Sequence, residues 1–556
     1  MKSRALFKYH LVSLLFALLL LLSLLPAEGK VIFVEKDFTV KELPDSVGQG
    51  FEPHILAGEG IDGKQWYYVD SPTGLGNTQG GNLWISKDYG ESWQWYDKDT
   101  VLGTSGDSYT ATSKDGVIYY TDLYLSTASV DFSLDGGETW IANPLASEYV
   151  IVDRQWLVVG PNSVGAENLY FAFNQLAVGL VMVKSQLIST TGGALDWVPC
   201  NNGLPISSDV ASRDNFAVDQ NNGNIYIANY QSNGIFCYIS KDEGESFTGV
   251  KVFDETEHAK VQNTFIQIDV DTAGNVYMMW SSRDHIMLAV SQDEGSSWDV
   301  KQVTESPGTR VLPWIAAGDP GRIAMAWYET PDVGNPNNLD DSIWDFVVAT
   351  TINALDKEPT YEITVVDPMA HVGSVRTSGL DGDEGPPPDR DLGDFISVDI
   401  DELGRAIVAF GHDGDDGPNA RQAVCMFARQ NEGPFLFKDV GPLAEFTFKI
   451  SGLKIKVDAS TSVDLNGKGI VNYTWDWGDN TTTSTGKVAE HNYKKAGIYN
   501  VTLKVENQDG QIIKKTILIK VEEEKEFNYL PFAVSALLIL LALASAYLFK
   551  KKKQRK

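Results

Sequence analysis

The chain has 556 residues, a formal net charge of −30 at pH 7, 11% aromatic residues and 50 glycines. This length is enough for several domains that each bury a core. The acidic balance argues against nucleic acid as a partner, and three cysteines (Cys200, Cys237 and Cys425) are too few for a disulfide-rich scaffold.

The N-terminal segment reads as a secretory leader. Residues 1–29 begin with Lys2, Arg4 and Lys8, continue through an apolar run and end in P-A-E-G. This order of charge, apolar stretch and small residues predicts a signal peptide that is removed from the mature protein.

A short string recurs from residue 30 to about residue 440. It reads Ser-x-Asp-x-Gly-x-(Ser/Thr)-Trp, with Phe in place of Trp in one copy, at intervals of about 50 residues. Its defining residues are Ser86, Asp88, Gly90 and Trp93; Ser133, Asp135, Gly137 and Trp140; Ser240, Asp242, Gly244 and Phe247; and Ser291, Asp293, Gly295 and Trp298. A degraded copy runs from Ser189 to Trp197. Ser and Asp side chains can pin a tight turn, Gly accepts a positive φ, and Trp supplies an apolar anchor.

A second repeat precedes each copy of the first. It includes E-N-L-Y-F-A from Glu167, G-N-I-Y-I-A from Gly223 and G-N-V-Y-M-M from Gly274, and it follows apolar strands such as 265–270 and 395–400. Four antiparallel strands per unit, repeated about seven times, predict an all-β fold of the β-propeller type. The sixth and seventh repeats lack a recognisable box, so six blades with an insertion remain an alternative to seven.

These strings resemble the Asp-box (bacterial neuraminidase) repeats of the sialidase-like propeller superfamily, over residues 30–440. The resemblance implies that the box is a structural turn and that a ligand site lies on the opposite face, around the channel. It also raises sialidase-type hydrolysis of acidic sugars, for which the family uses an arginine triad. An F-R-I-P-like motif and the family's Tyr–Glu nucleophile pair are not found, so catalysis stays open.

Several arginines occur just before the expected inner strands. They are Arg154, Arg213, Arg310 and Arg390, and the loop S-S-R-D-H adds Arg283 and His285. Guanidinium groups suit carboxylates and phosphates, so these residues are candidate ligand contacts. The alternative is that each arginine pairs with a nearby carboxylate and ties two blades together.

Two glycine-rich acidic loops suggest a cation. They contain Asp381, Asp383, Asp413 and Asp415. Carboxylates spaced by glycine suit calcium, which takes six to eight oxygen ligands. The spacing departs from that of an EF-hand, and a solvated acidic loop is the alternative.

The character of the sequence changes near residue 445. The segments W-D-W-G-D (475–479) and G-I-Y-N-V-T-L-K-V (497–505) resemble a PKD domain, an immunoglobulin-like sandwich, expected over residues 445–522. The residues Asn472, Asn480 and Asn500 stand in N-x-T sequons and are candidates for glycosylation. The expected role of this domain is that of a spacer.

The C-terminal segment predicts a membrane anchor. Residues 529–549 are mostly apolar and uncharged, and residues 550–556 are basic. We therefore expect a single-pass protein of the cell membrane with its bulk outside. Its propeller would bind a glycan or a surface protein. The alternatives are a sialidase-type exo-glycosidase and a structural component of the cell envelope.

Overall fold

The computed structural model describes most of the chain between residues 31 and 522. The described ranges are 31–34, 38–44, 51–72, 81–97, 106–124, 127–143, 146, 149–187, 195–208, 215–231, 234–254, 265–282, 284–375, 392–414, 423–437, 441–464, 469–508 and 510–522. The chain divides into two compact units, Met1–Val440 and Gly441–Lys556. Strands dominate both, and the described helical turns are η1 (Asn201–Gly203) and η2 (Pro336–Asn338).

The described residues of the first unit form seven antiparallel sheets. In chain order the first three consist of β3 (His54–Glu59), β4 (Gln65–Ser71), β5 (Asn82–Ser86) and β6 (Gln94–Asp97); β7 (Ser108–Thr112), β8 (Ile118–Tyr124) and β9 (Thr127–Ser133); and β10 (Val152–Pro161), β11 (Glu167–Gln175), β12 (Gly179–Gln186) and β13 (Val198–Pro199). The next three consist of β14 (Phe216–Val218), β15 (Ile225–Gln231), β16 (Gly234–Ser240) and β17 (Thr248–Asp254); β18 (Gln267–Val270), β19 (Val276–Ser281), β20 (Ile286–Ser291) and β21 (Asp299–Gln302); and β22 (Thr309–Ala317), β23 (Ile323–Thr330), β24 (Ile343–Thr351) and β25 (Glu362–Val372). The last contains β26 (Ser397–Ile400), β27 (Ala406–His412) and β28 (Val424–Gln430), joined by β2 (Phe38–Glu42) and β1 (Val31–Val34).

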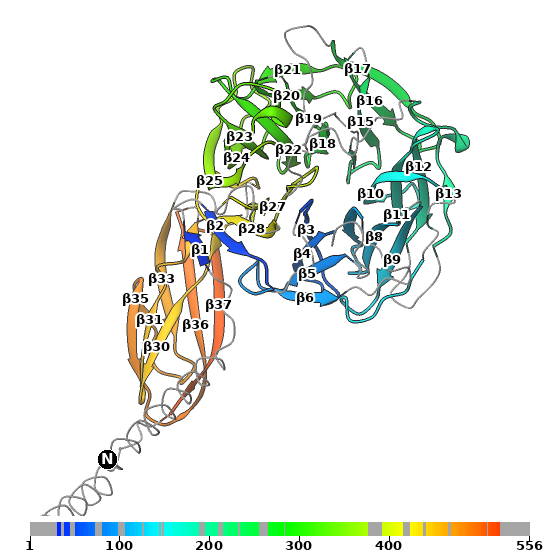
Figure 1. Cartoon of the computed structure of the whole chain (residues 1–556). Helices are drawn as coiled ribbons and strands as arrows, with labels where there is room; N and C mark the ends of the chain where they lie inside the picture. Colours follow the sequence, from blue (N-terminus) through cyan, green and yellow to red (C-terminus); the bar gives the residue numbers. More distant parts are fainter. Residues whose placement is uncertain are drawn as a thin grey trace, which may run out of the picture. The chain divides into compact units, whose positions relative to one another are not determined.

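The seven sheets form a ring (Figure 1), and we call the region along the axis of this ring the channel. Each first strand, from β3 to β26, packs against the first strand of the next sheet, and β26 packs against β3. The N-terminal strand β2 pairs with β28, so that residues from the two ends of the unit share one sheet. This is the circular arrangement of a β-propeller, in which radial repetition leaves few free sheet edges.

The four intact copies of the repeated string form the same turn. In the copy at residues 291–298, Ser291 Oγ donates to Asp293 Oδ1 at 2.8 Å and accepts from Gly295 N at 2.9 Å. Asp293 also accepts from the backbone and the hydroxyl of Ser297, at 2.8 and 2.6 Å. The copies that begin at Ser86, Ser133 and Ser240 repeat these bonds. The string therefore closes the hairpin between the third and fourth strands.

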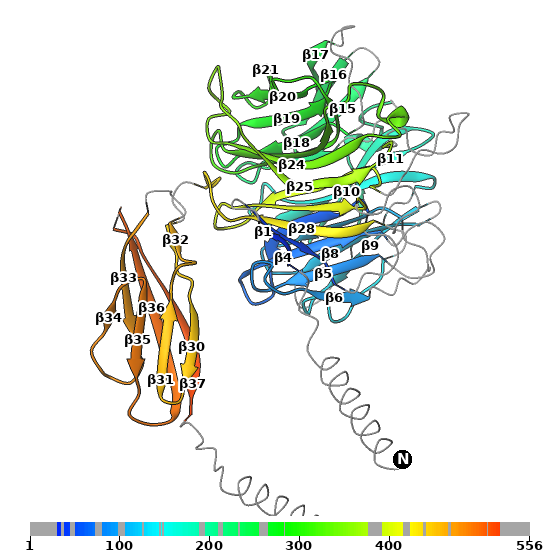
Figure 2. The ribbon, with the colours of Figure 1, turned by 60° about the vertical axis from the view of Figure 1, so that its left-hand side comes forward.

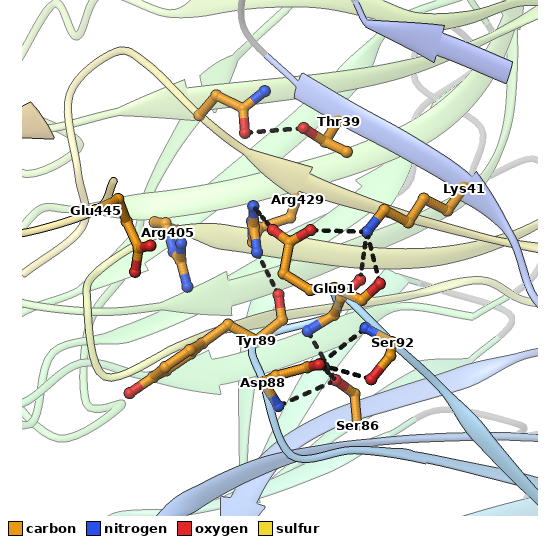
Figure 3. A network of polar contacts seen from close by, with 12 residues as sticks. Thr39, Lys41, Ser86, Asp88, Tyr89, Glu91, Ser92, Arg405, Arg429 and Glu445 are labelled. Carbon is orange, nitrogen blue, oxygen red and sulfur yellow. Dashed lines mark hydrogen bonds and ion pairs between the residues drawn. The ribbon is translucent and has the colours of Figure 1, made fainter. Parts of the chain in front are cut away.

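The turn also joins neighbouring sheets. In Figure 3, the turn at Ser86–Ser92 lies against β2 and β28. Lys41 Nζ donates to the carbonyl of Gly90 at 2.9 Å, and Arg429 donates to the carbonyl of Tyr89 and to the carboxylate of Glu91. The first sheet is thereby fastened to the last.

The sixth sheet contains an equivalent turn that the sequence pattern does not reveal. Thr351 Oγ1 donates to Asn353 Oδ1 at 2.9 Å, and Asn353 Oδ1 accepts from Thr360 N at 3.0 Å. Thr and Asn replace Ser and Asp, and the loop is three residues longer, so the string is unrecognisable although the hydrogen bonds persist.

The second unit is a sandwich of short antiparallel strands (Figure 2). Its sheets are β29 (Pro442–Leu443) with β32 (Val463–Asp464); β30 (Thr447–Ser451), β31 (Lys454–Asp458) and β35 (Val488–Asn492); and β34 (Ser484–Thr485), β33 (Ile470–Asp476), β36 (Gly497–Asn507) and β37 (Ile512–Val521). Val501, Leu503 and Val505 alternate along β36 into a core that contains Trp475. The sequon asparagines Asn472, Asn480 and Asn500 are all exposed, and their modification remains a prediction.

Three expected segments lie outside the described residues. They are the leader (1–29), the apolar segment (529–549) and the basic tail (550–556). Within the described part of the chain, no helix has the length and apolar character needed to cross a membrane.

Candidate functional site

The described candidate residues lie at the end of the channel opposite the repeated turns. Because neighbouring strands run antiparallel, the chain enters each first strand at the end where the second and third strands are joined. Arg154 and Arg310 lie near the starts of β10 and β22, and His285 directly precedes β20. We call this end the entry face.

Arg154 is the centre of a buried ionic cluster. Its Nη1 lies 3.1 Å from Asp107 Oδ2 and 3.8 Å from Glu52 Oε2, and its Nη2 contacts Asp394 Oδ2. The three acidic residues precede β3, β7 and β26, so the cluster joins four sheets. Arg154 thus pairs with carboxylates and ties sheets together, which is the second interpretation given above. Its main partners are distant in sequence, and the adjacent Asp153 is not among them.

The environment stabilises the charge of Arg154. Burial acts to lower the pKa of the guanidinium, but the charges of Asp107, Glu52 and Asp153 outweigh it and leave the pKa above its ordinary value. The residue has φ of +53°, a left-handed conformation that is uncommon outside glycine. The surrounding contacts therefore hold both the side chain and the backbone in place.

An aromatic layer closes the channel next to Arg154. The guanidinium lies 5.0 Å from the ring centre of Phe265 and 5.9 Å from that of Phe395. Trp156 packs against both rings and against Trp314, with ring centres 5.5 to 6.4 Å apart. Each ring comes from a different sheet, so this layer is a core shared by four of the sheets.

Arg310 and His285 are brought together by Asp284. Arg310 donates to the carbonyl of Asp284 at 2.7 Å and to Glu329 Oε2 at 3.0 Å. His285 Nε2 lies 3.8 Å from Asp284 Oδ1, and its Nδ1 lies 3.0 Å from the carbonyl of Thr304. A carbonyl can only accept, so Nδ1 carries a hydrogen, and Nε2 is an acceptor when the ring is neutral.

The side chains of this second cluster are partly accessible. Asp284 is 33% exposed, Glu329 27% and His285 20%, whereas the Arg310 side chain is 8% exposed. The accessible groups are thus oxygen and nitrogen acceptors, and the guanidinium lies beneath them. We call Asp284, His285 and Glu329 the acceptor row.

Asp413 takes part in a pair of reciprocal contacts. His371 Nδ1 lies 2.7 Å from Asp413 Oδ1, and His412 Nδ1 lies 2.7 Å from Asp367 Oδ2. These contacts connect β25 with the end of β27, across two sheets. Among the described residues, no group of three or more His, Cys, Asp or Glu side chains is arranged to hold a metal ion.

Other predicted site residues cannot be placed. Outside the described ranges lie Arg213, Arg283, Arg390, Asp381, Asp383 and Asp415. The described arginines, Arg154 and Arg310, are held by different sets of protein acceptors. Calcium binding remains a prediction.

The partners of Arg154 and the aromatic layer were not predicted from the sequence. A signal for the latter existed in the related strings F-I-Q-I-D (265–269) and F-I-S-V-D (395–399). No comparable local pattern marks Glu52, Asp107 and Asp394, because the three residues share only their place before a first strand.

The chain is similar to known proteins over different shares of its length. The phage phi92 endosialidase structure aligns with 88% of this chain and 88% of its own, at 11% identity and a TM-score of 0.38. The pre-pro-metalloprotease PrtV of Vibrio cholerae is 27% identical over 209 residues, and the match covers 38% of this chain but 21% of PrtV. The chain therefore spans about a fifth of the length of the curated relatives it matches.

The second unit has the more specific match. The crystal structure of the PKD1 domain of V. cholerae PrtV is 38% identical, covering 15% of this chain and 98% of that domain, with a TM-score of 0.14. Residues 440–521 match the PKD domain family. The chain therefore carries a PKD domain over residues 440–521.

Proposed function

We propose that this protein is a membrane-anchored cell-surface receptor whose propeller binds a neutral glycan without cleaving it. In this proposal the seven sheets are seven blades, the repeated turns are Asp-boxes, and the PKD domain is a spacer between the propeller and the membrane.

The observation that carries the proposal is the acceptor row. Its accessible groups are the carboxylates of Asp284 and Glu329 and the Nε2 atom of His285. Acceptors of this kind bind the hydroxyl donors of a sugar, and two carboxylates repel an acidic one. Because Arg310 already donates to Glu329 and to backbone carbonyls, it supports the row from beneath.

The contacts of Arg154 disfavour the sialidase-type alternative. An arginine triad must present free donors to a sugar carboxylate, and Arg154 is instead surrounded by Asp107, Glu52 and Asp394. Glycoside hydrolysis further requires two catalytic groups at a set separation. In the acceptor row, Arg310 holds the Glu329 carboxylate by a hydrogen bond, and the Asp284 carboxylate lies beside His285.

The test is a glycan array probed with the purified full chain, followed by hydrolysis assays on the same glycans. We expect binding to neutral glycans, at least tenfold weaker binding in Asp284→Asn and His285→Gln, and no released sugar. Asp299→Asn is the matched control, because it removes one exposed carboxylate on β21. Release of sialic acid or uronate that His285→Gln abolishes would establish the glycosidase alternative. Unchanged binding in both variants would refute the acceptor row as the site.

A further inference from the structure

A cavity lies in the channel on the other side of the aromatic layer from Arg154. It has a volume of about 380 Å³, within the range of small-molecule sites. Tyr109 and Trp314 line its inner end, and Gln220, Asn221 and Thr272 line its rim. The three rim residues are exposed, so the cavity opens at the end of the channel that carries the repeated turns.

Two aspartates occupy equivalent places in its wall. Asp269 Oδ2 accepts from Ala317 N, and Asp399 Oδ2 accepts from Ala57 N, each at 2.7 Å and each from the first strand of the following sheet. The other oxygen of each accepts from the next residue along the chain. The backbone thus fixes both carboxyl groups, and each oxygen keeps one lone pair for a ligand.

Both carboxyl groups face the cavity from deep within the ring. Asp269 and Asp399 are among its lining residues and keep some accessible surface. Asp271 also lines the cavity and is held by Asn275 and Tyr277. The described lining includes three aspartates and neither lysine nor arginine. The cavity is therefore negatively charged when these groups are ionised.

The remaining lining suits an organic cation more than a hydrated metal ion. Tyr109, Trp314 and Phe437 contribute aromatic rings, whose faces attract ammonium groups. Aromatic rings beside carboxylates therefore favour an organic cation.

We propose that this cavity binds a small organic ammonium ion. The carboxylates of Asp269 and Asp399 neutralise the ammonium, and the aromatic rings surround its alkyl groups. The site is separate from the acceptor row, so a test of choline binding does not depend on whether the protein binds a glycan.

The direct test uses choline as the probe and isothermal titration calorimetry of the full chain at pH 8. We expect saturable binding of choline, and at least tenfold weaker binding of 3,3-dimethylbutanol, its uncharged isostere. Asp399→Asn should weaken choline binding at least tenfold, whereas Asp299→Asn, which removes an exposed carboxylate elsewhere, should not change it. Thermal unfolding of each variant confirms that it is folded.

The pH dependence of choline binding supplies a second test. Burial raises the pKa of Asp269 to about 7, and the charges of Asp399 and Asp271 raise it further. Burial raises the pKa of Asp399 to about 6, and the charge of Asp401 raises it further. His54 faces Asp399 and lowers its pKa. Choline binding should therefore weaken severalfold from pH 8 to pH 5.5. No binding at 10 mM choline and pH 8, or equal binding of the uncharged isostere, would overturn the proposal.

Discussion

At the scale of single residues, Arg154 shows how a charge can be buried at the centre of a propeller. Three carboxylates from three sheets surround its guanidinium, and two aromatic rings cover it. A buried ion pair need not stabilise a protein relative to an apolar core, but removing one partner leaves the others buried without compensation. The residue therefore functions as a lock between sheets.

We expect Arg154→Met to destabilise the first unit by about 3–5 kcal/mol, because Asp107, Glu52 and Asp394 would lose their common partner. Urea denaturation measures this change. Lys64→Met, which removes an exposed cation paired at 3.8 Å with Asp62, should change the stability little. Equal effects of the two substitutions would contradict the role of Arg154 as a lock.

Asp269 leads to a prediction about pH. Its pKa of about 7 in the folded chain is above the value of about 3.9 in the unfolded chain, so the folded state retains a proton that the unfolded state has lost. Its contribution to stability therefore falls as pH rises from about 4 to about 7. In Asp269→Asn we expect a smaller loss of melting temperature between pH 5 and pH 8 than in the parent protein. Differential scanning calorimetry without ligand measures it, and parallel pH profiles would refute the assignment.

At the scale of elements, the repeated turn is a local structure with a tertiary role. Its Ser and Asp satisfy the backbone within the loop, and its glycine permits close approach to the neighbouring sheet. Gly295 has φ of +79°, and a Cβ there would lie 2.5 Å from Cδ1 of Ile239 in the preceding sheet. The turn is thus specified by its own hydrogen bonds and by the packing of the ring.

Gly295→Ala should cost about 1–3 kcal/mol, because strain in φ adds to the steric contact with Ile239. Gly165→Ala is the matched control: its φ is +78°, and nothing lies within 4 Å of the added Cβ. The control isolates the conformational cost, which we expect to be about 1 kcal/mol. Chemical denaturation of both variants measures the difference, and equal losses would exclude a packing role for the turn.

At the scale of the whole molecule, the two units have separate hydrophobic cores. The core around Trp475 contains residues from the second unit alone, and Val40 on β2 lies in the core of the first. Ring closure depends on β2, because it pairs with β28 from the other end of the unit.

We expect two unfolding transitions that respond to different substitutions. Val40→Asp places a charge at a fully buried position of β2 and should lower the first unit's transition by several kcal/mol. Trp475→Ala should lower that of the PKD domain by about 3–5 kcal/mol. Calorimetry of the full chain separates the two, and a single transition shifted equally by both substitutions would contradict this division.

Features that depend on interactions between neighbouring residues could be predicted from the sequence. These features are the alternating strands, the turn formed by Ser291, Asp293 and Gly295, and the PKD segment around Trp475. They could be predicted because their interactions span a few residues or follow a short period. The equivalent turn of the sixth sheet was missed, because Thr351 and Asn353 make similar hydrogen bonds but are different residue types from Ser and Asp.

Which distant residues meet could not be predicted from the sequence, because it depends on how the ring closes. The two described arginines lie in different clusters. Arg154 meets Glu52 and Asp394 from sheets far apart in sequence, and Arg310 lies near His285 because both contact Asp284. The channel cavity likewise exists because the first strands of all seven sheets surround one axis. Ring closure sets these contacts, and no local pattern encodes the partner that closure brings to each side chain.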